Sequence, residues 1–251
     1  MFKKNILGKY AVRYYQCSHC GFAQTEEPYW LDESYSDAIN ETDIGLISRN
    51  KLFCEIATTF FSLAGYNRDR KFLDYGGGYG MFVRMMRDNG FNYFNFDKFC
   101  QNLFASRFDE PDPTLTSEQY ELISAFEVFE HLIDPISEIE KLLAHSDSIL
   151  FSTELFKSGK LEDWWYIMPE HGQHVAFYSR KTLEFIANKY QLHLYTNNRT
   201  LHLLTKKRIN PFFYRISCSY PLARIYNSIF SPKSLLESDY AMYVNSEKEK
   251  V

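Results

Sequence analysis

The sequence predicts an α/β fold, a doubly wound and mostly parallel sheet that ends in an antiparallel hairpin. Between residues 47 and 205, short apolar segments alternate with stretches of helical periodicity. A glycine-rich turn joins one of these segments to the helix that follows it. The last two apolar segments flank Asn197-Asn198, which is typical of a hairpin. Strands separated by helices pair in parallel through crossover connections, so the hairpin supplies an antiparallel edge.

Each element is predicted from its own pattern. Apolar residues at helical spacing predict a helix over 47–63, and Gly65 is a plausible stop. Pro135 and Ser179 are typical of residues that open a helix, and Gly90 of one that ends it. The other expected helices are 81–89, 99–107, 136–144 and 182–190, and the expected strands are 71–75, 92–96, 120–126, 148–152 and the two hairpin segments QLHLYTNN and TLHLLTKK.

Composition excludes several classes of protein. The 251 residues are 45% hydrophobic and 24% charged, so the chain folds around a core. A net charge of −4 argues against a general nucleic-acid binder. No apolar run reaches the length of a membrane span, and the N-terminus lacks the apolar segment of a signal peptide. With five cysteines, an odd number, we expect reduced thiols and a cytoplasmic protein.

We expect three regions. Residues 1–46 look irregular and would form a lid or a degenerate cysteine module, residues 47–205 the α/β domain, and residues 206–251 a C-terminal extension. Aromatic residues of segment 26–43 would either fold over a ligand or pack on the surface. The extension mixes basic and aromatic residues, and we expect it to pack on the core or on a second subunit rather than on a membrane.

The segment FLDYGGGYG, residues 72–80, is the most informative. Glycines at a strand-to-helix turn let the backbone approach a ligand, and free N–H groups at the helix start favour polar or anionic groups. Asp97 closes the next strand, where a carboxylate can accept the hydroxyl protons of a ribose. The dinucleotide fingerprint G-x-G-x-x-G fails, because Met81 stands at its third glycine. A dehydrogenase therefore stays only a remote alternative.

The pattern Asp74-x-Gly76-x-Gly78-x-Gly80 resembles motif I of the class I S-adenosylmethionine (SAM) dependent methyltransferases. The resemblance continues through Asp97 to the segment AFEVFEHLIDP (125–135), which is similar to the segment after strand 4 of that superfamily. It implies a Rossmann-like, doubly wound, seven-stranded sheet, with SAM as cofactor and S-adenosylhomocysteine (SAH) as product.

The resemblance also implies roles for single residues. Asp74 would hold the methionyl amino group of SAM, and the glycines of motif I would pass under its methionyl and ribose parts. Asp97 would bind the ribose hydroxyls, and Lys98 or the residue after it would flank the adenine. Phe126 and Glu127 would form a wall beside the sulfonium. No clear acidic partner for the adenine amino group is found, although Asp109 is a candidate.

Acceptor-side residues are expected after the fifth strand. Residues 164–179 resemble the W-x-Y-x-x-P and Q-H-x-x-F-[YF]-S segments of methyltransferases that act on sugars, glycan precursors and related metabolites. His171 and His174 are therefore the leading candidates for a base or a substrate contact, with His131 as a third. Two questions stay open here. His174 could contact the substrate or only orient the loop, and the aromatic residues Trp164–Tyr166 could stack on a sugar or fill the core.

The N-terminal Cys17-x-x-Cys20 resembles the start of a zinc module that precedes some sugar methyltransferases. Structural zinc needs four ligands and no second pair follows, so we expect no metal. The resulting hypothesis is a small-molecule methyltransferase that methylates an oxygen of a sugar, a sugar nucleotide or a phosphorylated glycan precursor of a surface polysaccharide. The alternatives are N- or C-methylation of a small metabolite, SAM binding without turnover, and an RNA or protein methyltransferase, which the acidic balance disfavours.

Overall fold

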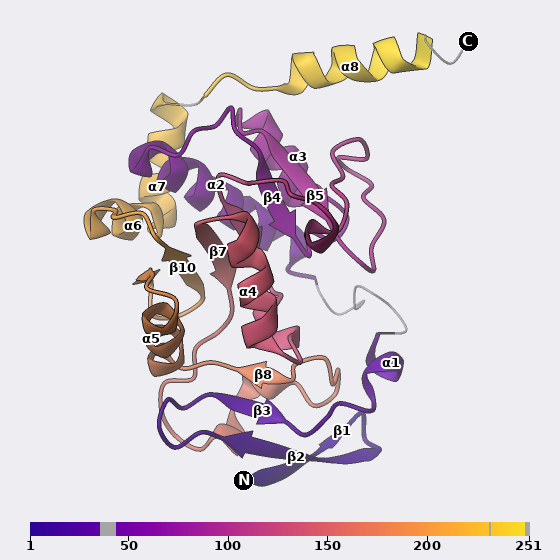
Figure 1. Ribbon diagram of the computed structural model, residues 1–251, viewed down its shortest axis with the longest axis vertical. Coiled ribbons are helices and arrows are strands. Elements are labelled where there is room, and N and C mark those ends of the chain that lie inside the picture. Colours follow the sequence, from indigo (N-terminus) through magenta and orange to yellow (C-terminus); the bar gives the residue numbers. More distant parts are fainter. Residues whose placement is uncertain (36–43, 231, 249–251) are drawn as a thin grey trace. The chain divides into compact units, whose positions relative to one another are not determined.

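The computed structural model describes residues 1–35, 44–230 and 232–248. The chain divides into two compact units, each built from two stretches of sequence (Figure 1). The first unit comprises residues 1–43 and 123–208, and the second comprises 44–122 and 209–251. The limits expected after residues 46 and 205 lie close to these boundaries, and the division into three regions stays a prediction.

The second unit contains a parallel strand pair and its connecting helix. Strands β4 (Phe72–Tyr75) and β5 (Tyr93–Phe96) pair in parallel, and α3 (Met81–Asp88) lies between them in sequence. Helix α2 (Leu46–Ala64) precedes them and ends at Gly65, whose φ of 66° is the left-handed conformation favoured by glycine. These elements confirm the helices predicted over 47–63 and 81–89 and the strands predicted over 71–75 and 92–96.

The first unit contains four further strands in the order β6-β7-β10-β9. Strands β6 (Ile123–Ala125) and β7 (Ser148–Ser152) are parallel, whereas β10 (Leu201–Thr205) pairs antiparallel with both β7 and β9 (His193–Thr196). The antiparallel final hairpin is therefore confirmed. Helices α4 (Pro135–His145) and α5 (Arg180–Lys189) begin after the N-caps Asp134 and Ser179. Across both units the described residues supply six such strands, and a seventh is not found among them.

The expectation of an irregular N-terminus is wrong, because this region forms a second sheet. Strands β1 (Phe2–Ile6), β2 (Tyr10–Gln16) and β3 (Ala23–Thr25) pair antiparallel, and β8 (Ala176–Phe177) completes the sheet (Figure 1). Val12, Tyr14 and Trp30 are buried in a cluster with Phe177. Trp30 is thus a core residue, and of the segment expected as a lid, residues 36–43 lie outside the described residues.

The helix expected over 99–107 is also wrong. The amide groups that would build it are used elsewhere: the Asp97 carboxylate accepts from the N–H groups of Phe99 and Cys100. Asn102 Oδ1 accepts from the N–H of Ala105. Side chains that hydrogen-bond to nearby backbone in this way compete with a helix.

Short helices form elsewhere in both units. They are α1 (Leu31–Ser34), η1 (Pro113–Leu115), η2 (Phe129–His131), η3 (Leu161–Asp163) and η4 (Trp165–Ile167).

The C-terminal extension forms helices that pack within the second unit. They are α6 (Pro211–Ser217), α7 (Tyr220–Ile229) and α8 (Leu236–Lys248). Thr59 of α2 donates to the carbonyl of Ala223 at 3.2 Å, and the rings of Phe60 and Tyr214 lie 5.3 Å apart. Packing of the extension on its own unit is thereby confirmed, and a homodimer stays a prediction.

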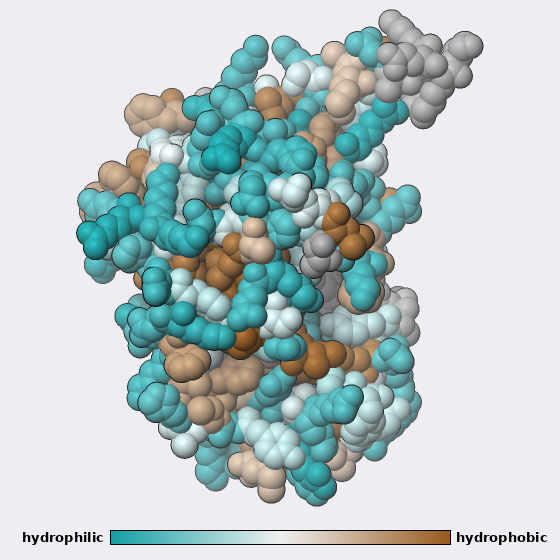
Figure 2. All heavy atoms as spheres, viewed as in Figure 1, coloured by the Kyte–Doolittle hydropathy of each residue, from teal (hydrophilic) through white to brown (hydrophobic). Residues whose placement is uncertain are grey.

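Hydrophilic residues cover most of the face seen in Figure 2, with apolar residues scattered between them. Exposed apolar side chains include Ile225 and Ile229 of helix α7 and Phe230 at its end. Among the described helices, none combines the length and the hydrophobicity needed to cross a membrane. The cytoplasmic setting stays a prediction.

We expect Ser179→Ala to destabilise the first unit. Ser179 Oγ accepts from the N–H of Thr182 and donates to the carbonyl of Cys20 at 2.6 Å, so it caps α5 and joins it to the β2–β3 turn. The loss of both bonds should lower the free energy of unfolding by about 1–2 kcal/mol, measured by urea denaturation. Ser158→Ala, at an exposed site, is the control and should stay within about 0.5 kcal/mol of the parent. Equal stability of the two variants would contradict this account.

Candidate cofactor and acceptor sites

The glycine turn leaves the end of β4 as the sequence predicts. Gly76 and Gly77 both donate their N–H groups to the carbonyl of Phe96 at the end of β5, at 2.8 and 3.2 Å. Gly78 and Gly80 have φ values of 55° and 77°, a conformation that residues with a Cβ rarely adopt. The turn is therefore fixed to the carboxyl ends of both strands before α3 begins.

Two side-chain oxygens converge beside Gly77. A Cβ at this position would overlap Asn95 Oδ1 and would lie 2.7 Å from Asp74 Oδ2. Asp74 and Asn95 are both buried and stand opposite each other in the parallel register of β4 and β5. Asn95 Oδ1 has no hydrogen-bond partner among the described residues. A pair of acceptors matches a group that only donates, such as the ammonium of a methionyl moiety.

The Asp97 carboxylate is oriented by the backbone around it. Oδ2 accepts from the N–H of Gly78, and Oδ1 from those of Phe99 and Cys100, each at 2.8 Å. An ionised carboxylate offers about four acceptor positions, so it can still accept from a hydroxyl. The second unit thus brings together Asp74, the motif I glycines and Asp97, and its donor and acceptor set fits the amino and ribose groups of SAM.

The loop after Asp97 is attached to the glycine turn. Gly80 has no room for a Cβ because Asn102 Oδ1 occupies that place. Asn102 Nδ2 also donates to Asp109 Oδ1 at 2.9 Å, so Asp109, the candidate for the adenine amino group, holds this loop. Lys98 and Phe99 are exposed, with the Lys98 ammonium 5.6 Å from the centre of the Phe99 ring. Adenine contacts by these residues stay a prediction.

In the first unit, Glu127 follows β6 in a strained conformation. Its φ is 55°, which costs a non-glycine residue about 1–3 kcal/mol. Ser152, at the end of β7, stabilises this conformation. Its Oγ accepts from the Glu127 N–H at 2.7 Å and donates to Glu127 Oε1 at 2.5 Å. Phe126 beside it is half-buried. Their predicted role beside the sulfonium stays a prediction.

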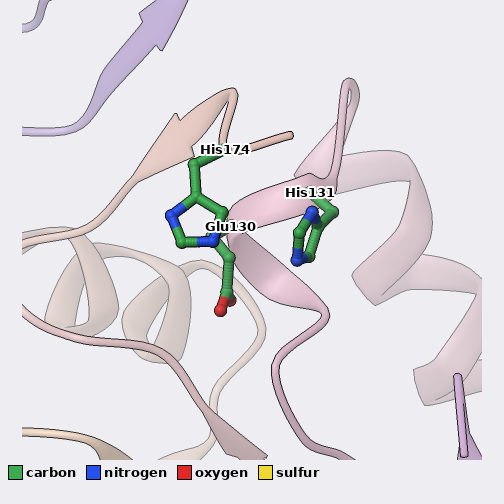
Figure 3. A group of neighbouring side chains, drawn as sticks. All are labelled: Glu130, His131 and His174. Atoms are coloured by element: carbon green, nitrogen blue, oxygen red, sulfur yellow. The ribbon is translucent and has the colours of Figure 1, made fainter. Parts of the chain in front are cut away.

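Three side chains of the first unit form a compact cluster. Glu130 and His131 lie in the short helix η2, and His174 lies just before β8, so residues distant in sequence face each other (Figure 3). One ligand atom of each lies within 4.8 Å of the other two. Glu130 is fully buried, and both histidines are half-buried. The structure thus brings together two of the three predicted histidines, while His171 is not part of this cluster.

Backbone carbonyls fix the tautomers of both rings. His131 Nδ1 lies 3.1 Å from the carbonyl of Gln173, and His174 Nδ1 lies 2.7 Å from that of Tyr166. A carbonyl only accepts, so each Nδ1 carries the proton and each Nε2 keeps a lone pair. Burial lowers the pKa of His131 to about 4. Burial, with a contribution from His131, lowers the pKa of His174 to about 3, so both rings are neutral at physiological pH.

Two tyrosines hydrogen-bond to this cluster, a role that the sequence did not predict for either of them. Tyr166 Oη donates to Glu130 Oε1 at 2.5 Å, and burial, with Glu130 close by, raises the pKa of this tyrosine well above its usual value. Tyr35 Oη lies 2.8 Å from His131 Nδ1 and, because that nitrogen carries the proton, its oxygen accepts from it together with the Gln173 carbonyl. Of the aromatics expected to stack on a sugar or fill the core, Tyr166 is buried and Trp165 is 66% exposed. Only the proximity of Tyr166 to the candidate histidines in sequence pointed to such a role.

The N-terminal cysteines lie at the β2–β3 turn. Cys17 donates its N–H to the carbonyl of Phe22 at 2.7 Å, and Gly21 donates to the carbonyl of Cys17 at 2.9 Å. Hydrogen bonds from the backbone of Cys20 and His19 lower the pKa of the exposed Cys17 thiol. Within the described ranges no third metal-ligating residue joins these two cysteines. Backbone hydrogen bonds hold this turn, and the absence of a metal here stays a prediction.

Comparison with known proteins places this geometry in a family. The model of the methyltransferase domain family matches residues 48–197. The chain belongs to this family. It is a SAM-dependent methyltransferase with the Rossmann-like α/β fold, and SAM is its cofactor. The matched residues include the glycine turn, Asp97 and the histidine cluster.

Solved structures of methyltransferases are also similar to the chain, at low sequence identity. Magnesium protoporphyrin IX methyltransferase of Synechocystis PCC 6803 is 11% identical, with 71% of this chain and 96% of that chain covered and a TM-score of 0.43. Human N-acetylserotonin methyltransferase in complex with SAM is 14% identical, with 71% and 66% covered and a TM-score of 0.47. The N-terminal domain of EvdMO1 with SAH bound is 13% identical, with 62% and 81% covered and a TM-score of 0.43. No curated protein sequence matches the chain.

Proposed function

We propose that this methyltransferase transfers the methyl group of SAM to a hydroxyl oxygen of a small molecule, namely a sugar, a sugar nucleotide or a phosphorylated glycan precursor of a surface polysaccharide. The observation that carries the proposal is the cluster of two neutral histidines beside Glu130. Each histidine presents an Nε2 lone pair, which suits an acceptor that donates a hydrogen bond. The resemblance of residues 164–179 to sugar-type methyltransferases supports the class of acceptor.

The reaction requires an in-line displacement. The bond from acceptor oxygen to methyl carbon forms as the sulfonium S–CH₃ bond breaks and SAH is formed. The methylated oxygen then loses its proton to solvent water, and the products are released. SAM is already an activated donor, so the protein mainly orients the reactants and excludes water. In the proposal, Asp74, Asp97 and the glycine turn hold SAM, while His131 and His174 orient the acceptor hydroxyl through Nε2.

The lowered pKa values limit what the histidines do. A general base works best when its pKa is near the operating pH, and values of about 3 to 4 make both rings weak proton acceptors. Their role in the proposal is therefore to accept a hydrogen bond and to fix the direction of the oxygen lone pair. His171, outside the cluster, is left as a candidate for a substrate contact further along the same loop.

We expect His174→Asn to lower kcat by at least about tenfold, because a misdirected acceptor loses the benefit of orientation. The dissociation constant of SAM, measured by calorimetric titration, should change less than about twofold. His193→Gln on β9 is the matched control and should retain the parent turnover. An equal loss of SAM affinity in His174→Asn would contradict an acceptor-side role.

A panel of acceptors tests the substrate class. Purified protein is incubated with SAM and with nucleotide-activated sugars, phosphorylated glycerols or matched amines, and SAH formation is followed. We expect SAH with at least one hydroxyl acceptor of the sugar class and none with the amine that replaces that hydroxyl. SAH formation only with amine or carbon acceptors would overturn O-methylation while leaving the SAM-dependent reaction in place.

A further inference from the structure

We propose that Glu130, His131 and His174 form a binding site for a divalent transition-metal ion of the zinc type. When bound, this ion would hold the acceptor oxygen in place of the direct hydrogen bonds to the histidine Nε2 atoms. The role toward the acceptor rests on the proposed function. Metal binding itself does not, because all three residues lie in the first unit and can be tested without substrate.

The donor set matches the chemistry of such an ion. Two imidazole nitrogens and one carboxylate oxygen are a known ligand combination of catalytic zinc, and they leave one position open for water or substrate. Imidazole ligands also favour zinc, iron, nickel and copper over magnesium and calcium. The cluster contains no thiolate, so a purely structural site of the cysteine-rich kind does not form here.

Each of the three side chains is oriented by a further hydrogen bond. His131 and His174 donate from Nδ1 to backbone carbonyls, and Glu130 accepts from the hydroxyl of Tyr166. Metal-bound histidines nearly always donate their second ring nitrogen to a carbonyl or carboxylate, and ligating carboxylates are themselves hydrogen-bonded. Tyr166 serves two ligands, through its hydroxyl to Glu130 and through its carbonyl to His174, so it acts as a positioning residue.

The hydrogen bonds of both rings leave the ligating atom available. A metal binds an imidazole nitrogen that carries no proton. The carbonyls of Gln173 and Tyr166 accept from Nδ1 of His131 and of His174, so each Nε2 keeps its lone pair for a metal.

The spacing requires only a modest closure. Ligands bound at about 2.0–2.2 Å around a tetrahedral ion lie roughly 3.4 Å apart, whereas the three atoms here span up to 4.8 Å. Binding would draw the side chains together by about an ångström, which rotation of the half-buried imidazoles can supply. An ion at an open site of this kind polarises a bound oxygen and lowers its pKa, which two weakly basic histidines do not achieve.

Titration of the full-length protein with cobalt(II) and with zinc tests the site. Protein is first treated with a chelator, and binding is then followed by calorimetry and by the visible absorption of cobalt(II). We expect one equivalent to bind, with a spectrum of nitrogen and oxygen ligands and no thiolate charge-transfer band. His131→Asn and His174→Asn should each lose this binding, and Tyr166→Phe should weaken it by about 10–100-fold.

Three controls make the result decisive. The double variant Cys17→Ser/Cys20→Ser should bind the metal as the parent does, which separates this site from the N-terminal cysteines. His193→Gln should also bind normally. Circular dichroism confirms that each variant is folded, so that a loss of binding reports on the metal ligands and not on the fold.

Two outcomes would overturn the proposal: no binding by the folded parent, or equal binding by the parent and both histidine variants. SAM binding by the metal-free protein is measured separately, and its retention shows that a failure concerns the metal site alone. Full methylation by chelator-treated protein would overturn the role toward the acceptor.

Discussion

Replacing Gly77 by alanine is expected to abolish measurable SAM binding. A Cβ here would overlap Asn95 Oδ1 and press on Asp74, the two acceptors that would receive the amino group of SAM. Both side chains are buried, so they have little room to move without shifting the ends of β4 and β5. Overpacking of this kind costs about 1–3 kcal/mol of stability, and the displaced acceptors should remove affinity beyond that. Calorimetric titration with SAM measures the effect.

Gly159→Ala is the matched control for this prediction. Gly159 has a positive φ, of 95°, and nothing lies within 4 Å of the Cβ it would gain. Its substitution should cost only the backbone strain, about 1 kcal/mol, and leave SAM affinity unchanged. A Gly77→Ala protein that binds SAM as tightly as Gly159→Ala would show that the acceptors beside Gly77 do not contact the cofactor.

Asp97→Asn is expected to weaken SAM binding by more than about 100-fold, or roughly 3 kcal/mol, because two charge-assisted hydrogen bonds to the ribose are lost. The same change places an NH₂ group against backbone donors, since the carboxylate accepts from Gly78 on one oxygen and from Phe99 and Cys100 on the other. Some loss of stability should accompany the loss of affinity. Urea denaturation and calorimetry of the same preparation separate the two effects.

Asp69→Asn, in the loop before β4, serves as the control for the charge. Asp69 is exposed, and the change should leave both stability and SAM affinity within error. If Asp97→Asn is folded and takes up SAM as well as the parent does, the ribose hydroxyls are bound elsewhere, and the residue-by-residue roles inferred for this edge of β5 are wrong.

Elements with local signals were predictable from the sequence. Gly65 ends α2 in a left-handed conformation, Pro135 opens α4, and Ser179 caps α5 with its side chain. Each signal acts within one turn of helix, so it is readable without tertiary contacts. The glycine turn was readable for the same reason, because the positive φ values of Gly78 and Gly80 are typical of glycine.

The missed elements have different causes. Strand β3 has three residues and pairs with the neighbouring β2 and with β8, which lies about 150 positions later, so one of its two partners is not identified by any local pattern. The supposed helix over 99–107 is prevented by Asp97 and Asn102, whose side chains take the backbone donors. Propensity alone does not anticipate such competition.

In the candidate site, too, some residues lie within a sequence motif and others are brought to it only by the fold. Asn95 alternates with its neighbours along β5 like any strand residue, and only the register with Asp74 shows that it faces the turn. Glu130 and His131 are adjacent to the strand-4 motif, whereas His174 and Tyr166 reach them from a loop more than 30 residues later. Convergence of this kind is a property of the folded chain and not of spacing in the sequence.

The most direct measurement is a crystal structure of the protein with SAH bound. The account predicts density for SAH at the glycine turn, with the ribose hydroxyls on the Asp97 carboxylate and the amino group beside Asp74 Oδ2 and Asn95 Oδ1. Crystals grown with saturating SAH that show the turn empty, or SAH bound away from Asp97, would contradict it.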